Sequence, residues 1–163
     1  MPLELCRIDD RLVHGQVVVG WGQPLDIAFI VLVDDAVAAS DWEQELYRMG
    51  VPPEMEVTFV SVEAALAGLR AWQARPERGI LLTADVDTMR RVVEGAGGAV
   101  TAVNIGGIHH RAGREPKLRY VFLSPAEQAA LRHIAARGVT VTAQDLPSAS
   151  PVPLETVLAG SGA

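Results

Sequence analysis

The sequence predicts a single α/β domain with an open, mostly parallel central sheet of about seven strands and helices on both faces. Short apolar runs alternate with amphipathic segments along the chain, and strands that alternate with helices pair in parallel through right-handed crossovers. Most runs are uninterrupted rather than alternating, as expected for strands that are covered on both faces. We assign residues 1–163 to one domain, because a chain of 163 residues fits a single sizeable core.

The predicted strands are short apolar runs with polar residues at their ends. The first strand leads into two carboxylates, Asp9 and Asp10, and the second is the longest apolar run and ends before Asp34. The full set of predicted strands covers 3–8, 27–33, 56–60, 79–83, 100–105, 118–123 and 139–144.

The predicted helices lie between these strands and have recognisable starts and stops. Ser124 precedes Pro125 and stands three residues before Glu127, which is the signature of a capping box with proline in the first turn. The N-cap candidates are Ser61, Asp85 and Ser124, and the stop candidates are Gly50 and Gly138. The predicted helices cover 15–22, 36–49, 62–74, 86–95 and 125–137, with a last short helix at 154–158.

Composition excludes several classes of protein. A net charge of −6 argues against general nucleic-acid binding. No apolar run reaches the ~18–20 residues of a transmembrane helix, and the first residues lack the pattern of a signal peptide. The single cysteine, Cys6, excludes an internal disulfide, suits a reducing cytoplasm and is expected to be a buried thiol. We therefore expect a cytoplasmic protein.

The most informative stretch is residues 7–17, Arg-Ile-Asp-Asp-Arg-Leu-Val-His-Gly-Gln-Val. Its order predicts a strand, a polar loop and a helix start. The unpaired N–H groups of a helix N-terminus, the planar fork of Arg11 and the imidazole of His14 can together hold a phosphoryl group. His14 would be the nucleophile, since much of an imidazole is unprotonated near neutral pH. The simpler alternative is a loop histidine that only bonds a nearby carbonyl.

The residues around His14 have roles to fill in such a site. Arg11 lies three residues earlier, close enough to curl back over the phosphoryl group. The backbone N–H groups of Gly15 and Gln16 can complete the cradle, and glycine lets the backbone approach closely. These residues would act by position and charge, which is how most phosphoryl transfer is catalysed.

Asp9 and Asp10 need a different task, because two unmitigated carboxylates would repel a phosphoryl group. One of them is expected to bond Arg7 or Arg11 and to hold its guanidinium in place. The other would accept a hydrogen bond from the imidazole N–H of His14 and so select its tautomer. Capping of the loop is an equally good alternative for each carboxylate.

Further candidates follow other strands at the same edge of the sheet, because ligands of open α/β sheets bind outside the carboxyl ends of strands. This rule adds Asp34, Asp35, Gly106, Gly107 and His109 to the rim. The two glycines either bring backbone close to phosphate or, as we favour, supply a tight turn that needs glycine geometry. A basic run of Arg111, Arg114, Lys117 and Arg119 either faces this site and docks an acidic partner or forms a solvated loop.

Several of these motifs resemble a known family. Residues 7–17 are similar to the signature of the enzyme IIB components of the mannose/fructose/sorbose family of the bacterial phosphotransferase system. Residues 31–35, the Val-Asn-Ile-Gly-Gly-Ile-His stretch at 103–109 and the closing residues 153–158 resemble further parts of that family. Residues 18–22 lack the more usual Thr-Arg-Trp, a departure that bears on the partner or the sugar rather than on the transfer step.

The resemblance implies a function and partners. His14 would accept a phosphoryl group, on Nδ1, from the phosphohistidine of an enzyme IIA, with Arg11 in contact with that group. It would pass the group to a sugar of the mannose/fructose/sorbose class bound by the membrane enzymes IIC and IID. The resemblance implies no cofactor and no metal, a peripheral association with the membrane components, and a homo-oligomer such as a dimer.

Two other functions are consistent with the residues. A regulatory phospho-switch would use the same chemistry at His14 and move no sugar. A metal-dependent hydrolase would use His14, His109, His110 and the aspartates of the rim, although the chain lacks the usual helical spacing of histidine ligands.

Overall fold

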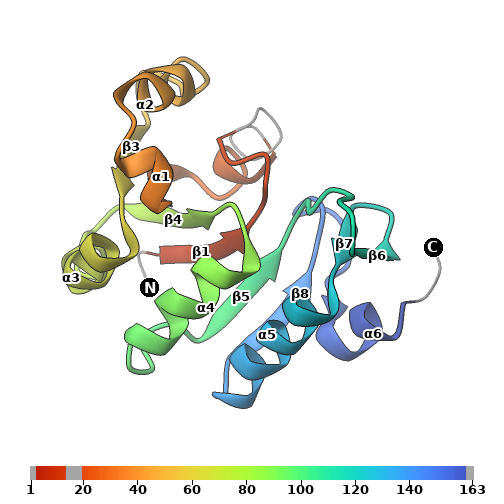
Figure 1. The fold of residues 1–163 in the computed structure, drawn as a ribbon. Helices are drawn as coiled ribbons and strands as arrows, with labels where there is room; N and C mark the ends of the chain where they lie inside the picture. The colour runs from red at the N-terminus through yellow and green to blue at the C-terminus, as the bar shows by residue number, and fades with distance from the viewer. Residues whose placement is uncertain (1–2, 14–19, 161–163) are drawn as a thin grey trace.

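A central sheet flanked by helices organises residues 3–13 and 20–160, which the computed structural model describes (Figure 1). The strands in these ranges are β1 (Leu3–Ile8), β2 (Ile27–Val33), β3 (Glu56–Val60), β4 (Arg78–Thr83), β5 (Ala102–Ile105), β6 (Glu115–Leu118), β7 (Val121–Leu123), β8 (Thr140–Ala143) and β9 (Val152–Pro153). The helices are α1 (Asp35–Ala38), α2 (Asp41–Arg48), α3 (Val62–Gln73), α4 (Val86–Gly95), α5 (Pro125–Ala136) and α6 (Leu154–Ala159).

The strand order confirms the predicted α/β architecture. Within the described residues, seven strands pair in the order β3-β2-β4-β1-β5-β8-β9. All neighbours are parallel except β9, which pairs antiparallel with β8. The long connections between the parallel strands contain the helices, as a parallel sheet requires.

Apolar side chains cover the sheet from both sides. Helices α3, α4 and α5 lie along one face (Figure 1), where they pack on fully buried strand residues such as Val31 and Leu81. On the opposite face, Leu12 and Trp21 from the connection between β1 and β2 pack against Ile30. The chain therefore leaves β1 toward one face and β5 toward the other. Adjacent strands with that property form a topological switch point, where open α/β sheets bind ligands.

The predicted helix caps are present. Ser61 and Asp85 accept hydrogen bonds from backbone N–H groups in the first turns of α3 and α4, at 3.1 and 2.7 Å. Ser124 and Glu127 form the reciprocal capping box, with bonds of 3.1 and 2.8 Å. Gly138 follows α5 with φ +85°, a conformation that favours glycine. Such caps stabilise each helix by about 1 kcal/mol.

The strand predicted at 118–123 is right only for Leu118, the last residue of β6, and for residues 121–123, which form β7, and its expected place in the main sheet is wrong. This stretch instead contributes to the antiparallel hairpin of β6 and β7, which lies outside the main sheet. Pro116 lies within β6 and has no N–H to donate, so this segment suits a two-stranded hairpin better than a central strand. The seventh strand of the main sheet is β9, which we did not predict.

The helix predicted at 36–49 is two helices. Ser40 has extended backbone and begins α2. The Gln44 side chain donates to the carbonyls of Val37 and Ala38, at 3.1 Å each, so the exposed end of α1 is satisfied from within the next helix. Of the helix predicted at 15–22, residues 15–19 lie outside the described residues, and residues 20–22 form a π-helical turn. The other predicted elements agree with the structure to within about two residues.

Cys6 packs against the larger core cluster, although its side chain keeps intermediate exposure. Burial raises the pKa of its thiol to about 12, so Cys6 is an inert thiol at neutral pH. None of the helices in the described ranges is long and apolar enough to span a bilayer.

Candidate functional site

The loops that follow β1, β5 and β8 meet at the switch point. The backbone N–H of Gly106 donates to Ile8 at 2.7 Å, and that of Asp10 donates to Gly107 at 2.9 Å. The N–H of Gln144 donates to the carbonyl of Ile105 at 3.0 Å. These bonds continue the ladders of the sheet beyond its strands, so the side chains of the three loops project from a fixed frame.

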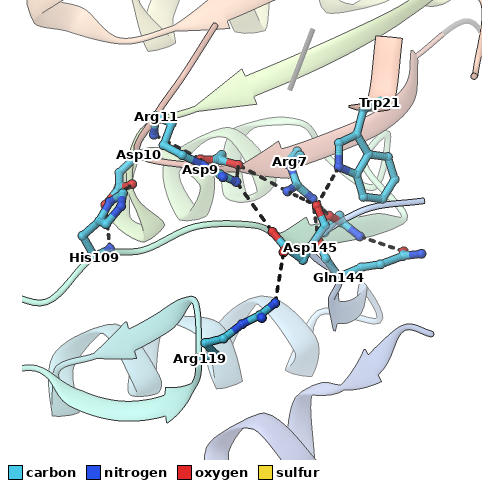
Figure 2. A network of polar contacts seen from close by, with 10 residues as sticks. Arg7, Asp9, Asp10, Arg11, Trp21, His109, Arg119, Gln144 and Asp145 are labelled. Atoms are coloured by element: carbon cyan, nitrogen blue, oxygen red, sulfur yellow. Dashed lines mark hydrogen bonds and ion pairs between the residues drawn. The ribbon is translucent and has the colours of Figure 1, made fainter. Parts of the chain in front are cut away.

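Asp9 is the centre of a buried charge network (Figure 2). Its side chain is fully buried and accepts two bonds from the guanidinium of Arg11, from Nε at 2.8 Å and from Nη2 at 2.6 Å. Arg7 donates to the same carboxylate at 3.2 Å. Burial alone would raise the pKa of Asp9, but the bond from Arg11 and the charges of both arginines outweigh it and lower that pKa. Asp9 is therefore the carboxylate that holds both guanidinium groups.

Arg7 lies fully buried on β1 and joins strand β5 to the loops that follow β1 and β8. Its Nη1 donates to the side chain of Asn104 and, at 2.8 Å, to the carbonyl of Gln144. Its Nη2 donates to the carbonyl of Asp145 at 3.2 Å, and its guanidinium lies 4.6 Å from the ring centre of Trp21. Burial lowers the pKa of Arg7, and the charge of Asp9 partly offsets this effect. Arg7 thus orders the frame on which Arg11 sits.

Arg11 is the part of this network that reaches the surface, with 18% of its side chain exposed. The hydrogen bonds to Asp9 raise its pKa, which keeps the guanidinium charged. The turn that presents Arg11 places Leu12 in the left-handed region, with φ +52°, while its side chain is buried in the core. That conformation costs a non-glycine residue about 1 kcal/mol, so the core packing of Leu12 holds the turn in shape.

Among the described residues, Asp10 pairs with His109 on the loop after β5. Its Oδ1 lies 2.6 Å from His109 Nδ1, and its Oδ2 accepts the backbone N–H of His109 at 2.7 Å. The predicted partner of Asp10, His14, lies outside the described residues, as do Gly15 and Gln16. The pairing joins the loop after β1 to the loop after β5.

Gly106 and Gly107 have a reason to be glycine that differs from the predicted one. The tight-turn interpretation is wrong, because neither residue has a positive φ. A Cβ on Gly106 would overlap the guanidinium of Arg7 and lie 2.6 Å from Asp9 Oδ2. A Cβ on Gly107 would lie 3.0 Å from Arg11 Nε. The absent side chains leave room for the two arginines against the backbone of the loop.

Gly106→Ala should therefore destabilise the protein by about 1–3 kcal/mol, since neither Arg7 nor Asp9 can move without breaking buried bonds. Gly107→Ala is the matched comparison and should cost less, because its Cβ contact is longer. Urea unfolding of both variants measures the difference. A Gly106→Ala protein as stable as wild type would show that the network tolerates displacement.

Asp34 and Asp35 follow β2 as predicted but serve the structure there. Asp34 caps α1 through the N–H of Val37 at 3.0 Å. Asp35 accepts the N–H of Val62 at 2.9 Å and a bond from Arg91 at 3.0 Å. Strand β4 separates β2 from β1 in the sheet, so these carboxylates lie apart from the network around Asp9.

Arg114 and Lys117 of the basic run make contacts within the fold, whereas Arg119 reaches the candidate site. Arg114 forms a two-point ion pair with Glu127 at 2.9 and 2.8 Å, and Lys117 donates to the carbonyl of Leu158 at 3.1 Å. Arg119, in the turn between β6 and β7, reaches the network, with its Nη2 3.6 Å from Asp145 Oδ2. Within residues 3–13 and 20–160, no three His, Cys, Asp or Glu side chains gather as metal ligands.

Comparison with known proteins identifies the family. A sequence model of the PTS system sorbose subfamily IIB component matches residues 3–162. This chain belongs to that family. The IIB chain is 36% identical over 147 residues to the N-acetylgalactosamine-specific phosphotransferase enzyme IIB component 1 of Escherichia coli K12, covering 88% of this chain and 90% of that protein. It is 34% identical to the sorbose-specific EIIB component of Klebsiella pneumoniae over 140 residues, which are 85% of this chain and 84% of that one.

A solved structure supports the same assignment. The IIBSor domain of the Klebsiella pneumoniae sorbose permease superimposes on this IIB chain with a TM-score of 0.88 and 29% identity, over 100% of both chains. The fold predicted from sequence is therefore that of a IIB domain, and the chain is a component of a sugar phosphotransferase system.

The sequence also held signals for site residues that we did not single out. Asn104 is a polar residue within an apolar strand, Gln144 is the last residue of the strand predicted at 139–144, and Asp145 follows it on the same rim. Trp21 is buried in the core, and its Nε1 also donates to the carbonyl of Asp145 at 3.1 Å.

Proposed function

We propose that this IIB component accepts a phosphoryl group on Nδ1 of His14 from the phosphohistidine of an enzyme IIA. It then passes the group to a sugar of the mannose/fructose/sorbose class bound by the membrane enzymes IIC and IID, at the cytoplasmic face of the membrane. Family membership supports the proposal. The observation that carries it is the position of the Arg11 guanidinium. Arg11 lies three residues before His14 in the sequence, and Asp9 binds its guanidinium at two points.

The two proposed steps are displacements at phosphorus. In the first, the P–N bond to the histidine of enzyme IIA breaks as a P–N bond to His14 forms, and the leaving imidazole keeps the electron pair. In the second, a sugar hydroxyl forms a P–O bond and releases its proton to solvent, while the P–N bond to His14 breaks and the imidazole keeps the electron pair. Both steps need fixed positive charge on the phosphoryl oxygens.

The network around Asp9 suits that requirement. One carboxylate, Asp9, lies between two guanidinium groups, so these three side chains together carry one positive charge. The short bonds to Asp9 orient Arg11 in advance, which lowers the reorganisation needed during transfer. We propose that the backbone N–H groups of Gly15 and Gln16 add further donors, and that the protein acts as a homo-oligomer such as a dimer.

Phosphoryl uptake tests the proposal directly. The protein is incubated with phosphoenolpyruvate, enzyme I, the histidine phosphocarrier protein and a mannose-family enzyme IIA, and its intact mass is read before and after acid treatment. One acid-labile phosphoryl group is expected. No uptake from a demonstrably active enzyme IIA would reject the proposal. Discharge of the label by sugar and membranes containing IIC and IID would separate transport from a purely regulatory role.

Arg11→Lys should slow phosphoryl uptake at least about tenfold, because an ammonium cannot bind Asp9 at two points and also present a planar fork to phosphate. Rapid-quench measurement of uptake from phosphorylated enzyme IIA gives the rate. The matched control is Arg132→Lys, an exposed position on α5, which should leave the rate unchanged. Equal rates for wild type and Arg11→Lys would show that Arg11 has no direct role.

A further inference from the structure

Asp145 links two arginines that come from distant parts of the sequence. Figure 2 shows its carboxylate between Arg11 and Arg119, with Oδ1 3.9 Å from Arg11 Nη2 and Oδ2 3.6 Å from Arg119 Nη2. The three residues line a surface cavity of about 250 Å³, together with Gly107 and His109. Two guanidinium groups that converge on one anion across an open cavity form the arrangement that binds phosphate oxygens.

The two carboxylates that contact Arg11 hold it in different ways. Asp9 is fully buried and binds at 2.6 and 2.8 Å, distances typical of strong charge-assisted bonds. The carboxylate of Asp145 is 22% exposed and its contacts with both arginines are more than 3.5 Å long, while Arg119 is 83% exposed. Pairs of that kind stabilise a protein by less than about 1 kcal/mol and separate readily. Asp9 therefore holds Arg11 more tightly than Asp145 does, and the long contacts of Asp145 with the two arginines are the ones that a competing anion can replace.

The main chain of Asp145 is held independently of its carboxylate. Its carbonyl accepts bonds from Arg7 Nη2 at 3.2 Å and from Trp21 Nε1 at 3.1 Å. Rotation of the side chain away from the arginines therefore leaves the loop in place. Arg11 and Trp21 lie before and after residues 14–19 in the sequence, and both contact Asp145.

We propose that Arg11 and Arg119 form a binding site for phosphate oxygens, and that Asp145 occupies this site until a phosphoryl group displaces its carboxylate. This inference rests on the proposed function, in which the phosphoryl group is carried by His14. The exchange breaks no covalent bond. A phosphoryl group carries up to about two negative charges against one for a carboxylate, so it competes effectively for both guanidinium groups. Competition from Asp145 weakens the hold on the phosphoryl group and favours its onward transfer.

Asp145→Asn is the first test, because asparagine keeps the shape of the side chain and removes its charge. At a fixed ratio of phosphorylated to free enzyme IIA, the equilibrium constant for phosphorylation of the variant should rise about three- to tenfold above wild type. Arg119→Gln should lower it by a similar factor. The matched controls are Asp87→Asn and Arg132→Gln, which remove one charge of each sign from exposed positions on α4 and α5. Both controls should behave as wild type.

An equilibrium constant for Asp145→Asn that equals or falls below that of wild type overturns the inference. In that result Asp145 positions the arginines instead of competing for them, and the proposed function stands. The double variant Asp145→Asn/Arg119→Gln further distinguishes competition for the arginines from positioning of the arginines. Competition predicts that Asp145→Asn raises the equilibrium constant less when Arg119 is absent.

A second readout does not depend on phosphoryl transfer. Inorganic phosphate is titrated into wild type and Asp145→Asn, and the arginine Nε–Hε signals are followed by NMR. Tighter phosphate binding by Asp145→Asn, with shifts confined to Arg11 and Arg119, supports the inference even if wild type takes up no label and the proposed function fails. Equal affinity in the two proteins overturns it.

Discussion

Replacement of His14 by alanine is expected to abolish phosphoryl uptake by this IIB component. The proposed mechanism has a single acceptor nitrogen, and alanine offers no nucleophile in its place. Loss of the acceptor is an all-or-none effect, whereas loss of a supporting donor typically lowers a rate by about 10²–10³. Intact mass after incubation with phosphorylated enzyme IIA measures it, and far-UV circular dichroism checks that the variant is folded.

The chain offers two matched histidine controls. His109→Ala and His110→Ala remove exposed imidazoles on the neighbouring loop and should retain the label. His109 is the sharper control, because its Nδ1 contacts Asp10 and its loop lies at the same switch point. Label retained on His14→Ala, or lost only from His109→Ala, would move the acceptor to the loop after β5.

Asp9→Asn should have the largest effect on stability, with a loss of about 3 kcal/mol in the free energy of unfolding. The substitution leaves the guanidinium of Arg7 buried without its carboxylate partner, and a buried charge without compensation is costly. It also removes the charged partner that orients Arg11, so phosphoryl uptake should become slower in the same variant. Urea unfolding at neutral pH measures the loss. Asp87→Asn removes an exposed partner of Arg90 and should change stability by no more than about 0.5 kcal/mol.

The same variant predicts a pH dependence. The pKa of Asp9 is lowered in the folded protein relative to its ordinary value of 3.8, so its contribution is fully present above pH 3.8 and is lost as pH falls through the lower folded value. The stability advantage of wild type over Asp9→Asn should therefore shrink as pH falls below 3.8, where Asp9 of the unfolded chain takes up a proton, and should be lost at the lower folded pKa. A constant difference across that range would mean that the charge of Asp9 is not what stabilises the network.

The sequence by itself determined six of the seven strands in the main sheet and most of the helices of the described residues. Uninterrupted apolar runs, N-cap residues and a proline in a first turn act over a few neighbouring residues, so they can be recognised without knowing the fold. The same local logic, aided by family resemblance, predicts Arg11 and His14 as site residues and expects a carboxylate beside an arginine, which the pairing of Asp9 with Arg11 confirms. It placed residues 118–123 in the main sheet, whereas residues 121–123 form a strand of the separate hairpin.

Only the tertiary structure decided how the charges are arranged. Arg7 contacts Asn104 and Gln144 across 97 and 137 residues of sequence, and the rim rule does not say which side chains meet. The need for glycine at 106 comes from the guanidinium of Arg7 and not from the backbone conformation of Gly106 itself. Likewise, no local sequence pattern predicts that Asp10 binds His109 or that Asp145 lies between Arg11 and Arg119. Local signals specify elements, whereas buried ion pairs depend on the distances and burial that folding creates between them.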